Sequence, residues 1–549
     1  MHSTDAAPRD PHDAAHSHRA PDDAPPNAPG ERAPPTAPDL SFPFQTTDVL
    51  RTGMTNEYRE VSKSGVVPAA TAFYRAPSRL AREPTLDKEK QRRLAHVNLV
   101  VFKPDDPEDP RTWANWYRWV ITGLVAFSVV CVAFGSAVIT GDFQDLQGEF
   151  HIGEVVAALT VSLMVCGFAL GPAIWGPCSE LFGRRPIWII SFWLYTIMNI
   201  LCALAPNIGA LLAGRFLCGL FASSALVIAG GTISDLWDNN ERGFAIALFA
   251  AAPYGGPVLG PIVGGFVGEN IGWRWIIWVN MIFAGVVSAC LSFMPETFAP
   301  VILRRRARKL REETGHDNYA TEQELFPRPF SDLLPIMLLM SLYIAMIYGL
   351  LYAFFFAFPV VFGEGYGWNN GLVGLSFCPI LIGVALALFV TPRLEGRYAA
   401  QAARKGGRAD PEDRLPGMML GAPFIPISLF IFAWTSPPVV LPGPGTWVGP
   451  CMAGIPFGFG MTALYFAANA YLIDTFSASV ASALSAKTLV RSGAGAAMPL
   501  FITAMFHRLG NQWAGTLLAF LSVAILPIPY VFYFYGARIR AGSKLAAAA

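Results

Sequence analysis

The fold is decided by residues 170–186, LGPAIWGPCSELFGRRP, where an apolar run gives way to serine, glutamate, glycine and two arginines. A second apolar run, residues 187–205, follows directly. Arginine is costly at bilayer depth, so Arg184 and Arg185 are expected in water or among lipid headgroups. The stretch is therefore predicted to be the turn of a membrane hairpin. Its positive charge predicts that this turn faces the cytoplasm.

The composition agrees with a polytopic membrane protein. Of the 549 residues, 53% are hydrophobic and only 14% are charged, and the mean hydropathy is +0.42. A net charge of +1 without a basic domain gives no case for nucleic-acid binding. The eight cysteines fall in apolar stretches and form no CxxC pair, so they are predicted to pack as small hydrophobic residues. No metal site and no cofactor is expected.

Twelve apolar stretches near the roughly 20-residue length of a membrane-spanning helix follow one another along the chain. The loops between these stretches lie alternately on the two sides of the membrane. Loops on the same side as Arg184 hold most of the basic residues, whereas loops on the opposite side have only Arg274 and Arg508. This asymmetry predicts that both termini are cytoplasmic. The predicted spans are residues 118–139, 155–176, 187–205, 211–236, 244–268, 275–294, 336–362, 372–390, 418–434, 447–473, 479–506 and 513–535.

One long polar interruption splits the spans into two groups of six. The predicted fold is an all-α polytopic membrane protein with two pseudo-symmetric halves. Weak internal symmetry supports this, because PRLEGR at residues 392–397 resembles the stretch that ends at Arg184. The final alanine run is given no function. The predicted parts are a disordered cytoplasmic tail (1–113), the first half (114–294), a cytoplasmic central loop (295–335), the second half (336–535) and a cytoplasmic C-terminal tail (536–549).

Four motifs carry a resemblance to a known family. They are the lead-in DDPEDP at residues 105–110 with Trp113, the hairpin turn GPCSELFGRRP at 176–186, GPVLGPIVGG at 256–265 in span five, and PETFAP at 295–300 after span six. In this order and at these positions, the motifs resemble the fungal twelve-span drug:proton antiporters of the major facilitator superfamily. The resemblance implies a major facilitator fold, alternating access and coupling to inward proton movement.

The hairpin turn is predicted to act as a gate. Gly183 permits a tight turn, and Arg184 or Arg185 can pair with a carboxylate at a neighbouring helix end, such as Asp235. Such a pair would latch the halves together on the cytoplasmic side, with Gly176 and Glu180 in the same motif. The alternative is that the arginines only set the topology.

Span five combines close packing with prolines. Gly256, Gly260 and Gly264 repeat every four residues, which permits close approach to another helix, while Pro257 and Pro261 permit a kink. The resemblance implies a bendable seam between the halves that limits leakage. Simple helix packing is the alternative.

Two charged residues are assigned to proton coupling. Arg215 lies in span four in a stretch that resembles the family's proton-linked motif, and an arginine inside a span is a functional hypothesis by default. It could instead snorkel to the outer interface. Asp474, at the end of span ten, is the carboxylate predicted nearest to the cations of span eleven. Carboxylates in the spans are sparse, so facilitated export without tight coupling stays open.

The substrate cavity is predicted to combine aromatic and cationic side chains. Many relatives carry a glutamate where this chain has Phe356. Without that carboxylate, cationic drugs are less favoured as substrates. Lys487 and Arg491 lie four residues apart on one helix face and need a cavity or a partner. Their charge predicts an anionic or sugar-like substrate group. The alternative is that Lys487 only forms a structural pair. The predicted cavity residues are Tyr348, Tyr352, Phe356, Asn469, Lys487 and Arg491.

These features predict a secondary exporter of small organic or amphiphilic compounds, such as a secondary metabolite, glycolipid, organic acid or toxin. Broad multidrug efflux and nutrient import are the alternatives. No P-loop occurs and no catalytic constellation is evident, so an enzyme is not expected. The expected partners are substrate, protons and the bilayer. The expected protein is a monomer of the plasma membrane, with a vacuolar or vesicle membrane as the alternative.

Overall fold

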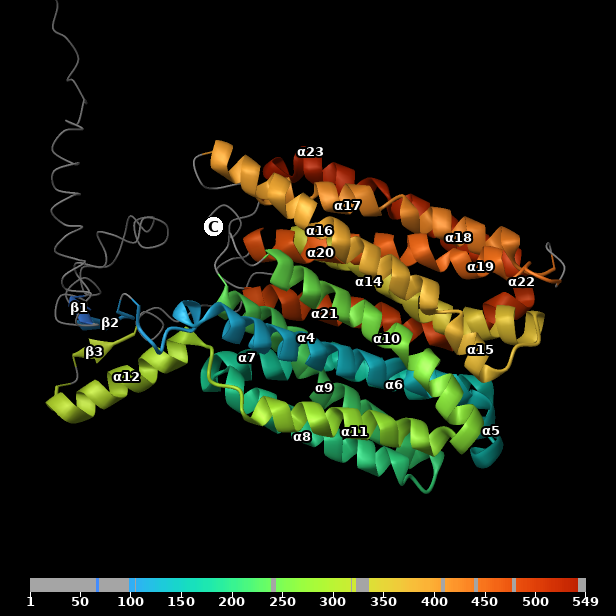
Figure 1. The fold of residues 1–549 in the computed structure, drawn as a ribbon, viewed down its shortest axis with the longest axis horizontal. Coiled ribbons are helices and arrows are strands. Elements are labelled where there is room, and N and C mark those ends of the chain that lie inside the picture. Colours follow the sequence, from blue (N-terminus) through green and yellow to red (C-terminus); the bar gives the residue numbers. More distant parts are fainter. Residues whose placement is uncertain are drawn as a thin grey trace, which may run out of the picture. The chain divides into compact units, whose positions relative to one another are not determined.

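A computed structural model describes residues 66–68, 98–103, 105–237, 243–316, 318–321, 335–405, 410–438, 443–475 and 480–541. The chain divides into two compact units, residues 1–57 and 58–549, and everything described belongs to the second. The predicted disorder of residues 1–65 and 69–97, and the alanine run at the C-terminus, lie outside the described residues. The described part is predominantly helical (Figure 1).

The first half follows the apolar runs of the sequence, and single residues set some of its helix boundaries. Asn207 accepts a hydrogen bond from the Ala210 N–H and so begins one helix, while Gly183, at φ +99°, separates two others. The elements are α4 (Asn115–Ala137), η2 (Val138–Asp142), α5 (Phe143–Phe150), α6 (Glu154–Leu170), α7 (Pro172–Phe182), α8 (Arg184–Ala203), α9 (Ile208–Leu236), α10 (Gly243–Ile271) and α11 (Trp273–Ser292).

The second half is more interrupted. Gly510, at φ +76°, breaks the helical path inside α22 and separates the last two predicted spans. The elements are α14 (Pro335–Phe358), η3 (Pro359–Gly365), α15 (Asn370–Leu375), α16 (Cys378–Arg404), η4 (Pro411–Arg414), α17 (Pro416–Gly421), α18 (Phe424–Thr435), α19 (Val448–Met452), α20 (Gly454–Thr475), α21 (Val480–Ala497), η5 (Met498–Leu500), α22 (Ile502–Ile525) and α23 (Pro527–Ala541).

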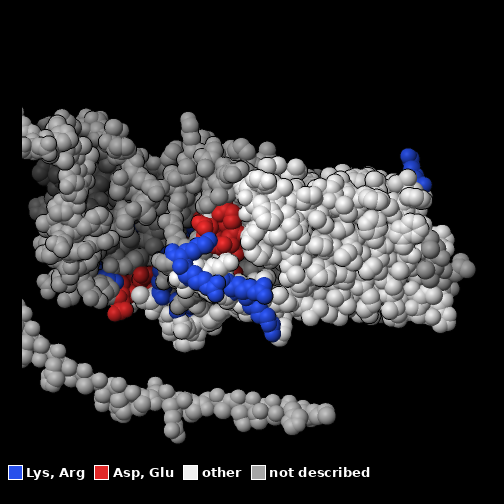
Figure 2. All heavy atoms as spheres, turned by 90° about the horizontal axis from the view of Figure 1, so that it is seen from above, with Lys and Arg blue, Asp and Glu red and all other residues white. Residues whose placement is uncertain are grey.

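Within the described residues, ten helices are long and apolar enough to cross a membrane, and α6 with α7 form an eleventh, bent by 40°. Helix α21 is missing from this set because Lys487, Arg491 and its small polar residues lower its hydropathy. All twelve predicted spans nevertheless contain helix. Figure 2 shows charged side chains gathered at one end of the bundle and an almost uncharged surface along the rest of that face. That surface suits contact with lipid tails.

The glycine motif of α10 makes the close helix packing that was predicted as the alternative to a seam between the halves. A Cβ on Gly256 would lie 2.7 Å from the Val130 carbonyl oxygen, and one on Gly264 would lie 2.2 Å from that of Val138. These glycines therefore fit α10 against α4 and η2 of its own half, so the predicted seam between the halves is not at this face. The seam uses the adjacent face, where Gly265 meets the backbone of Asn370. Gly260 also packs against η2, and Pro257 and Pro261 lie inside α10.

A small sheet and an additional helix stand apart from the all-α prediction. Strands β1 (Val66–Pro68), β2 (Asn98–Val100) and β3 (Tyr319–Ala320) form one sheet, and α12 (Ala299–Thr314) follows α11 (Figure 1). The lead-in before α4 is likewise structured rather than disordered. Arg306 of α12 binds Asp106 of this lead-in at 2.6 Å. Local composition cannot predict a contact between two residues so far apart in the sequence.

Gly219 gives a direct test of the packing inside the first half. A Cβ at this position would lie 1.9 Å from the Met164 carbonyl oxygen, so α9 and α6 would have to separate. We expect Gly219→Ala to destabilise the protein by about 1–3 kcal/mol, as overpacking does, and to lower the melting temperature of the purified protein. Gly255→Ala is the matched control, because its Cβ would meet nothing within 4 Å. Equal melting temperatures for the two variants would contradict this packing.

Candidate functional site

Two buried cations lie at the centre of the second half. Lys487 and Arg491 of α21 are both 0% exposed. The Lys487 ammonium donates to the Tyr465 hydroxyl at 3.2 Å and to the Asn469 side-chain oxygen. The Arg491 guanidinium donates to the same Tyr465 hydroxyl at 3.0 Å. One phenol of α20 therefore receives hydrogen bonds from both cations.

Further phenols connect these cations to the first half. Tyr254 of α10 packs against Tyr465 with ring centroids 4.9 Å apart, and Tyr348 of α14 lies under the Arg491 guanidinium at 4.3 Å. The Tyr352 hydroxyl lies 3.3 Å from that of Tyr348 and 2.7 Å from the Ser136 hydroxyl of α4. We call Ser136, Tyr254, Tyr348, Tyr352, Tyr465, Asn469, Lys487 and Arg491 the central cluster.

The central cluster has two positive charges and no matching carboxylate. Among the described residues, the hydrogen bonds of Lys487 and Arg491 go to Tyr465 and Asn469 only. The Nε and Nη2 atoms of Arg491 are buried without a hydrogen-bond partner. Unpaired buried donors on a cation are costly, so this is a place where an anionic or polar group would be stabilised.

The structure brings together most of the predicted cavity residues but not all. Phe356 lies one helical turn beyond Tyr352 and packs against Phe143 of the first half, with ring centroids 5.7 Å apart. The sequence reasoning missed Ser136, Tyr254 and Tyr465. Only Tyr465 had a usable signal, because it precedes Asn469 by four residues and so shares its helix face.

Arg215 of α9 does not reach the interface by snorkelling. It is 1% exposed and donates to the carbonyl oxygens of Thr160 at 3.0 Å, Gly135 at 3.0 Å and Ser136 at 3.2 Å. These bonds tie α9 to α6 and to the end of α4. Arg215 thus holds the backbone of Ser136, whose hydroxyl belongs to the central cluster.

The hairpin turn forms the predicted ion pair. Arg184 Nε lies 3.3 Å from Asp235 Oδ2, and the Arg184 guanidinium also donates to the Ser179 hydroxyl at 2.6 Å. Both partners belong to the first half, so the pair itself does not latch the halves, contrary to the prediction. Glu296 accepts from the backbone N–H groups of Arg184 at 2.8 Å and Arg185 at 3.2 Å.

Arg185 and Gly176 of the same motif make contacts of their own. Arg185 is exposed, and its backbone N–H donates to the Glu296 carboxylate. Glu180 and Gly176 lie on α7, and a Cβ on Gly176 would be 3.0 Å from the Ser485 hydroxyl of α21. The motif therefore touches the second half through Gly176.

An equivalent cluster occupies the second half. Arg414 binds Glu395 at 2.5 Å and Asp474 at 2.9 Å, and the Tyr398 hydroxyl donates to Asp474 at 3.1 Å. Asp474 is thus paired with Arg414 and not with the cations of α21, which corrects its predicted neighbourhood. The true counterpart of Arg184 is Arg414, because Arg397 of the PRLEGR stretch is exposed. We call the end of the molecule that holds Arg184, Arg414 and α12 the arginine end.

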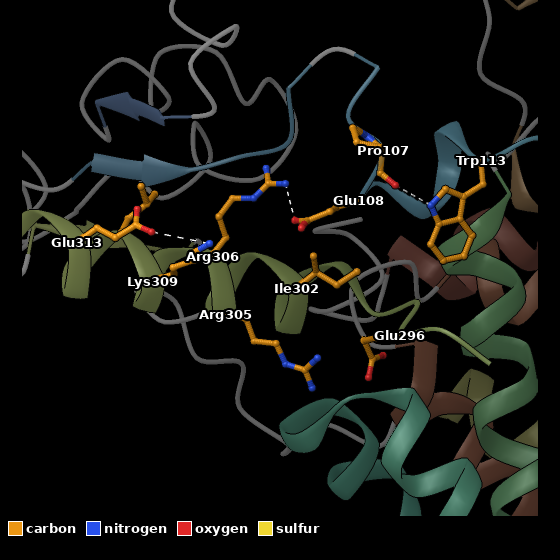
Figure 3. Close-up of a pocket in the computed structure, with 10 residues that line it drawn as sticks. Pro107, Glu108, Trp113, Glu296, Ile302, Arg305, Arg306, Lys309 and Glu313 are labelled. Carbon is orange, nitrogen blue, oxygen red and sulfur yellow. Dashed lines mark hydrogen bonds and ion pairs between the residues drawn. The ribbon is translucent and has the colours of Figure 1, made fainter. Parts of the chain in front are cut away.

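A pocket of about 580 Å³ lies beside α12 at the arginine end (Figure 3). It is lined by both signs of charge, including Arg305, Arg306, Glu108 and Glu296. The hydrogen bond from Arg306 lowers the pKa of Asp106 to about 2, so this tie between α12 and the lead-in is intact at neutral pH. Within the described residues, no group of three or more potential ligands for a metal ion occurs.

Comparison with known proteins agrees with this arrangement. The family model of the Major Facilitator Superfamily matches residues 125–449. An uncharacterized MFS-type transporter of Schizosaccharomyces pombe is 45% identical, over 93% of this chain and 90% of its own length. Multidrug transporter TPO3 of Candida glabrata is 46% identical, over 84% of this chain and 73% of its own. Polyamine transporter 3 of Saccharomyces cerevisiae is 44% identical, over 91% and 78%.

Solved structures share the fold at low identity. The proton:xylose symporter XylE superposes with a TM-score of 0.55 at 16% identity, covering 77% of this chain and 97% of its own. The human organic anion transporter MFSD10 gives a TM-score of 0.53 at 16% identity, covering 77% of this chain and all of its own. With two halves packed around a buried polar centre and close relatives that are transporters, the chain belongs to the major facilitator superfamily and is a multi-pass membrane transporter of the fungal drug-transporter type.

Proposed function

We propose that this transporter exports amphiphilic compounds with an anionic or polyhydroxylated head and an apolar portion, such as an organic acid, toxin or glycolipid. The observation that carries the proposal is the central cluster, where Lys487 and Arg491 are buried without a carboxylate and Arg491 has free donors. A carboxylate or several hydroxyl groups would satisfy those donors. The surrounding phenol rings offer apolar area for the rest of the substrate.

The export direction and the coupling belong to the same proposal. The excess of Lys and Arg at the arginine end favours a cytoplasmic position for that end, with both termini inside. The halves then alternate access to the central cluster as a monomer in the plasma membrane, with proton influx as the driving force. A vacuolar or vesicle membrane is the alternative location.

Broad multidrug or polyamine efflux is the second candidate, and it is favoured by the names of relatives. Polyamines are cations, and two buried cations in the central cluster disfavour them electrostatically. Nutrient import on the same fold is the third candidate. The central cluster favours an acid-headed compound over a polyamine, and the direction of transport distinguishes export from import.

The deciding experiment compares small molecules in cells and medium with and without this protein, together with tolerance of unrelated inhibitors and of spermidine. We expect one acidic or polyhydroxylated compound to be retained in the deletion strain while tolerance of inhibitors and spermidine is unchanged. Broad new sensitivity without a retained compound would favour the multidrug candidate. Loss of uptake of a nutrient would favour import.

A further inference from the structure

The two halves also meet at the end opposite to the arginine end, and acidic residues line this contact. Glu269 at the end of α10 accepts from the Asn369 side chain at 2.8 Å and from the Gly371 N–H at 3.0 Å. Asp142 at the end of η2 faces Asn370, whose side-chain nitrogen lies 3.4 Å from Asp142 Oδ1. We call this contact between η2, α10 and the start of α15 the outer seam.

The outer seam is closed in this structure. A Cβ on Gly141 would lie 2.4 Å from the backbone nitrogen of Gly265, and one on Gly374 would lie 2.4 Å from the Pro261 carbonyl oxygen. At these two contacts, η2 with α10 and α15 with α10, the backbones are too close for water to lie between them. Asp142 lies in this contact and is only 2% exposed.

The environment of Asp142 does not suit a negative charge. Its Oδ1 accepts only long contacts of 3.4 Å from the Asp145 N–H and from Asn370, and its Oδ2 is buried without a partner. Among the described residues, no lysine, arginine or histidine hydrogen-bonds or ion-pairs with Asp142. The ionisable group that acts on Asp142 is Asp145, another carboxylate. An ionised carboxylate buried without a cation is strongly disfavoured.

The charged groups that α10 and α11 bring to this end of the molecule bind partners other than Asp142. On α10, the backbone of Gly268 faces Asp142, while the carboxylate of Glu269 is turned toward α15. On α11, the guanidinium of Arg274 binds Glu149 at 2.6 Å and the carbonyl oxygen of Ala203 at 2.8 Å. On α15, the group that faces Asp142 is the neutral amide of Asn370.

We infer that Asp142 is a proton-binding site at which a proton from outside is taken up when the outer seam closes. In an open seam the carboxylate is wetted and can ionise, whereas closure removes water and requires a proton on Oδ2. Opening returns that proton to the outside, so acid outside favours the closed outer seam. The inference rests on the proposed function for its orientation, which places the outer seam on the outside. It concerns proton binding and not transfer across the membrane.

The test reads the outer seam directly and needs no substrate. Ile262 lies against Gly374 of α15, so Ile262→Cys reports whether water enters. The full-length protein in vesicles is treated from outside with a membrane-impermeant maleimide at pH 5 to pH 8, and peptide mass spectrometry quantifies labelling at residue 262. Labelling is normalised to an exposed Glu364→Cys variant. We expect the normalised labelling to fall toward acid pH by at most about tenfold per pH unit, the limit for one bound proton.

Asp142→Asn provides the decisive comparison. Asparagine keeps the cap on α5 but cannot ionise, so labelling at residue 262 should be low at every pH. Glu269→Gln is the matched control, because it alters an exposed carboxylate of the same seam and should leave the pH response in place. A second variant, Asn370→Asp, places a carboxylate opposite Asp142 and should raise labelling at pH 8 while keeping it sensitive to acid.

Each outcome decides between specific possibilities. An unchanged pH response in Asp142→Asn, or no response in the reporter with native Asp142, would overturn the proton site. A pH response that disappears in Glu269→Gln would assign the proton to Glu269 instead. A response that depends on Asp142, combined with failure of the export experiment, would keep the proton site and refute the export function. The two proposals can therefore fail separately.

Discussion

Replacing Lys487 or Arg491 by methionine is expected to lower export of an acid-headed substrate by at least about tenfold, because a hydrogen bond to a charged group contributes about 1.5–3 kcal/mol. Both side chains are fully buried and converge on Tyr465. The measurement is the initial rate of export per molecule of transporter at the membrane. The export rate of Lys487→Arg should lie between that of the methionine variant and that of the native chain, since it keeps the charge but not its geometry.

Stability separates a substrate-binding role from a structural one. A buried cation without a carboxylate carries a desolvation cost, and methionine removes it at similar volume. The melting temperature of Lys487→Met should therefore stay equal or rise while export falls. The alanine variants of Lys487 and Arg491 should likewise keep normal surface expression. Lys405→Met, at an exposed lysine of the arginine end, is the control for changes in overall charge.

Two outcomes would contradict this reading of the central cluster. Normal export by both methionine variants would leave the cations without a role in binding. A fall in melting temperature that accompanies the fall in export would make Lys487 a structural residue that supports Tyr465 and Asn469. Either outcome would make broad multidrug efflux the first candidate function.

The fold was predictable because membrane insertion constrains each span separately. A run of apolar residues near Arg184 must be helical and must end where the charges begin, whatever the remainder of the chain does. Capping residues and glycines then set local boundaries, as Gly183 and Gly510 do. The face of α10 used between the halves was not predictable, since Gly264 and Gly265 are adjacent and only the packed structure decides which helix each one meets.

The sites were predictable where one helix carried the signal. Lys487, Arg491 and Asn469 stand out because polar side chains inside apolar helices need partners. Tyr254 and Ser136 carry no such signal and join the central cluster only through contacts between the halves. Arg306 pairs with Asp106 across 200 residues, which explains why the lead-in is structured. Long-range pairs of this kind leave no periodic pattern in the sequence.

The equivalence of Arg184 and Arg414 shows why motif symmetry misled the sequence reasoning. PRLEGR resembles the hairpin turn in letters, yet its Arg397 is exposed while Arg414, 17 positions later, fills the equivalent position. Each of the two buried arginines binds an aspartate at the end of a helix, Asp235 in the first half and Asp474 in the second. Both halves therefore have an arginine–aspartate ion pair at this place, although the surrounding sequences differ.

Arg414→Ala is therefore expected to slow turnover by at least about tenfold with little change in KM, and Arg184→Ala to do the same. Removing one partner of a buried ion pair costs about 3–5 kcal/mol because it leaves uncompensated charge, here on Glu395 and Asp474. Turnover and KM are to be measured in vesicles under one fixed pH gradient. Selective loss of substrate affinity would refute a gating role for either arginine.

We expect the loss of either arginine to affect the contact between the halves, because the ion pairs of Arg414 and Arg184 both lie next to such a contact. A Cβ on Gly243 of the first half would be 2.1 Å from Glu395, the carboxylate that Arg414 holds. In the first half, Gly231 touches Arg184, and its neighbour Gly230 meets Leu484 of α21. Arg397→Ala is the matched control, because it removes an exposed arginine from the same helix as Glu395 and should leave turnover unchanged. If Arg397→Ala slowed transport and Arg414→Ala did not, the sequence resemblance of PRLEGR to the hairpin turn would have identified the gate. The ion pairs of Arg414 would then be only structural.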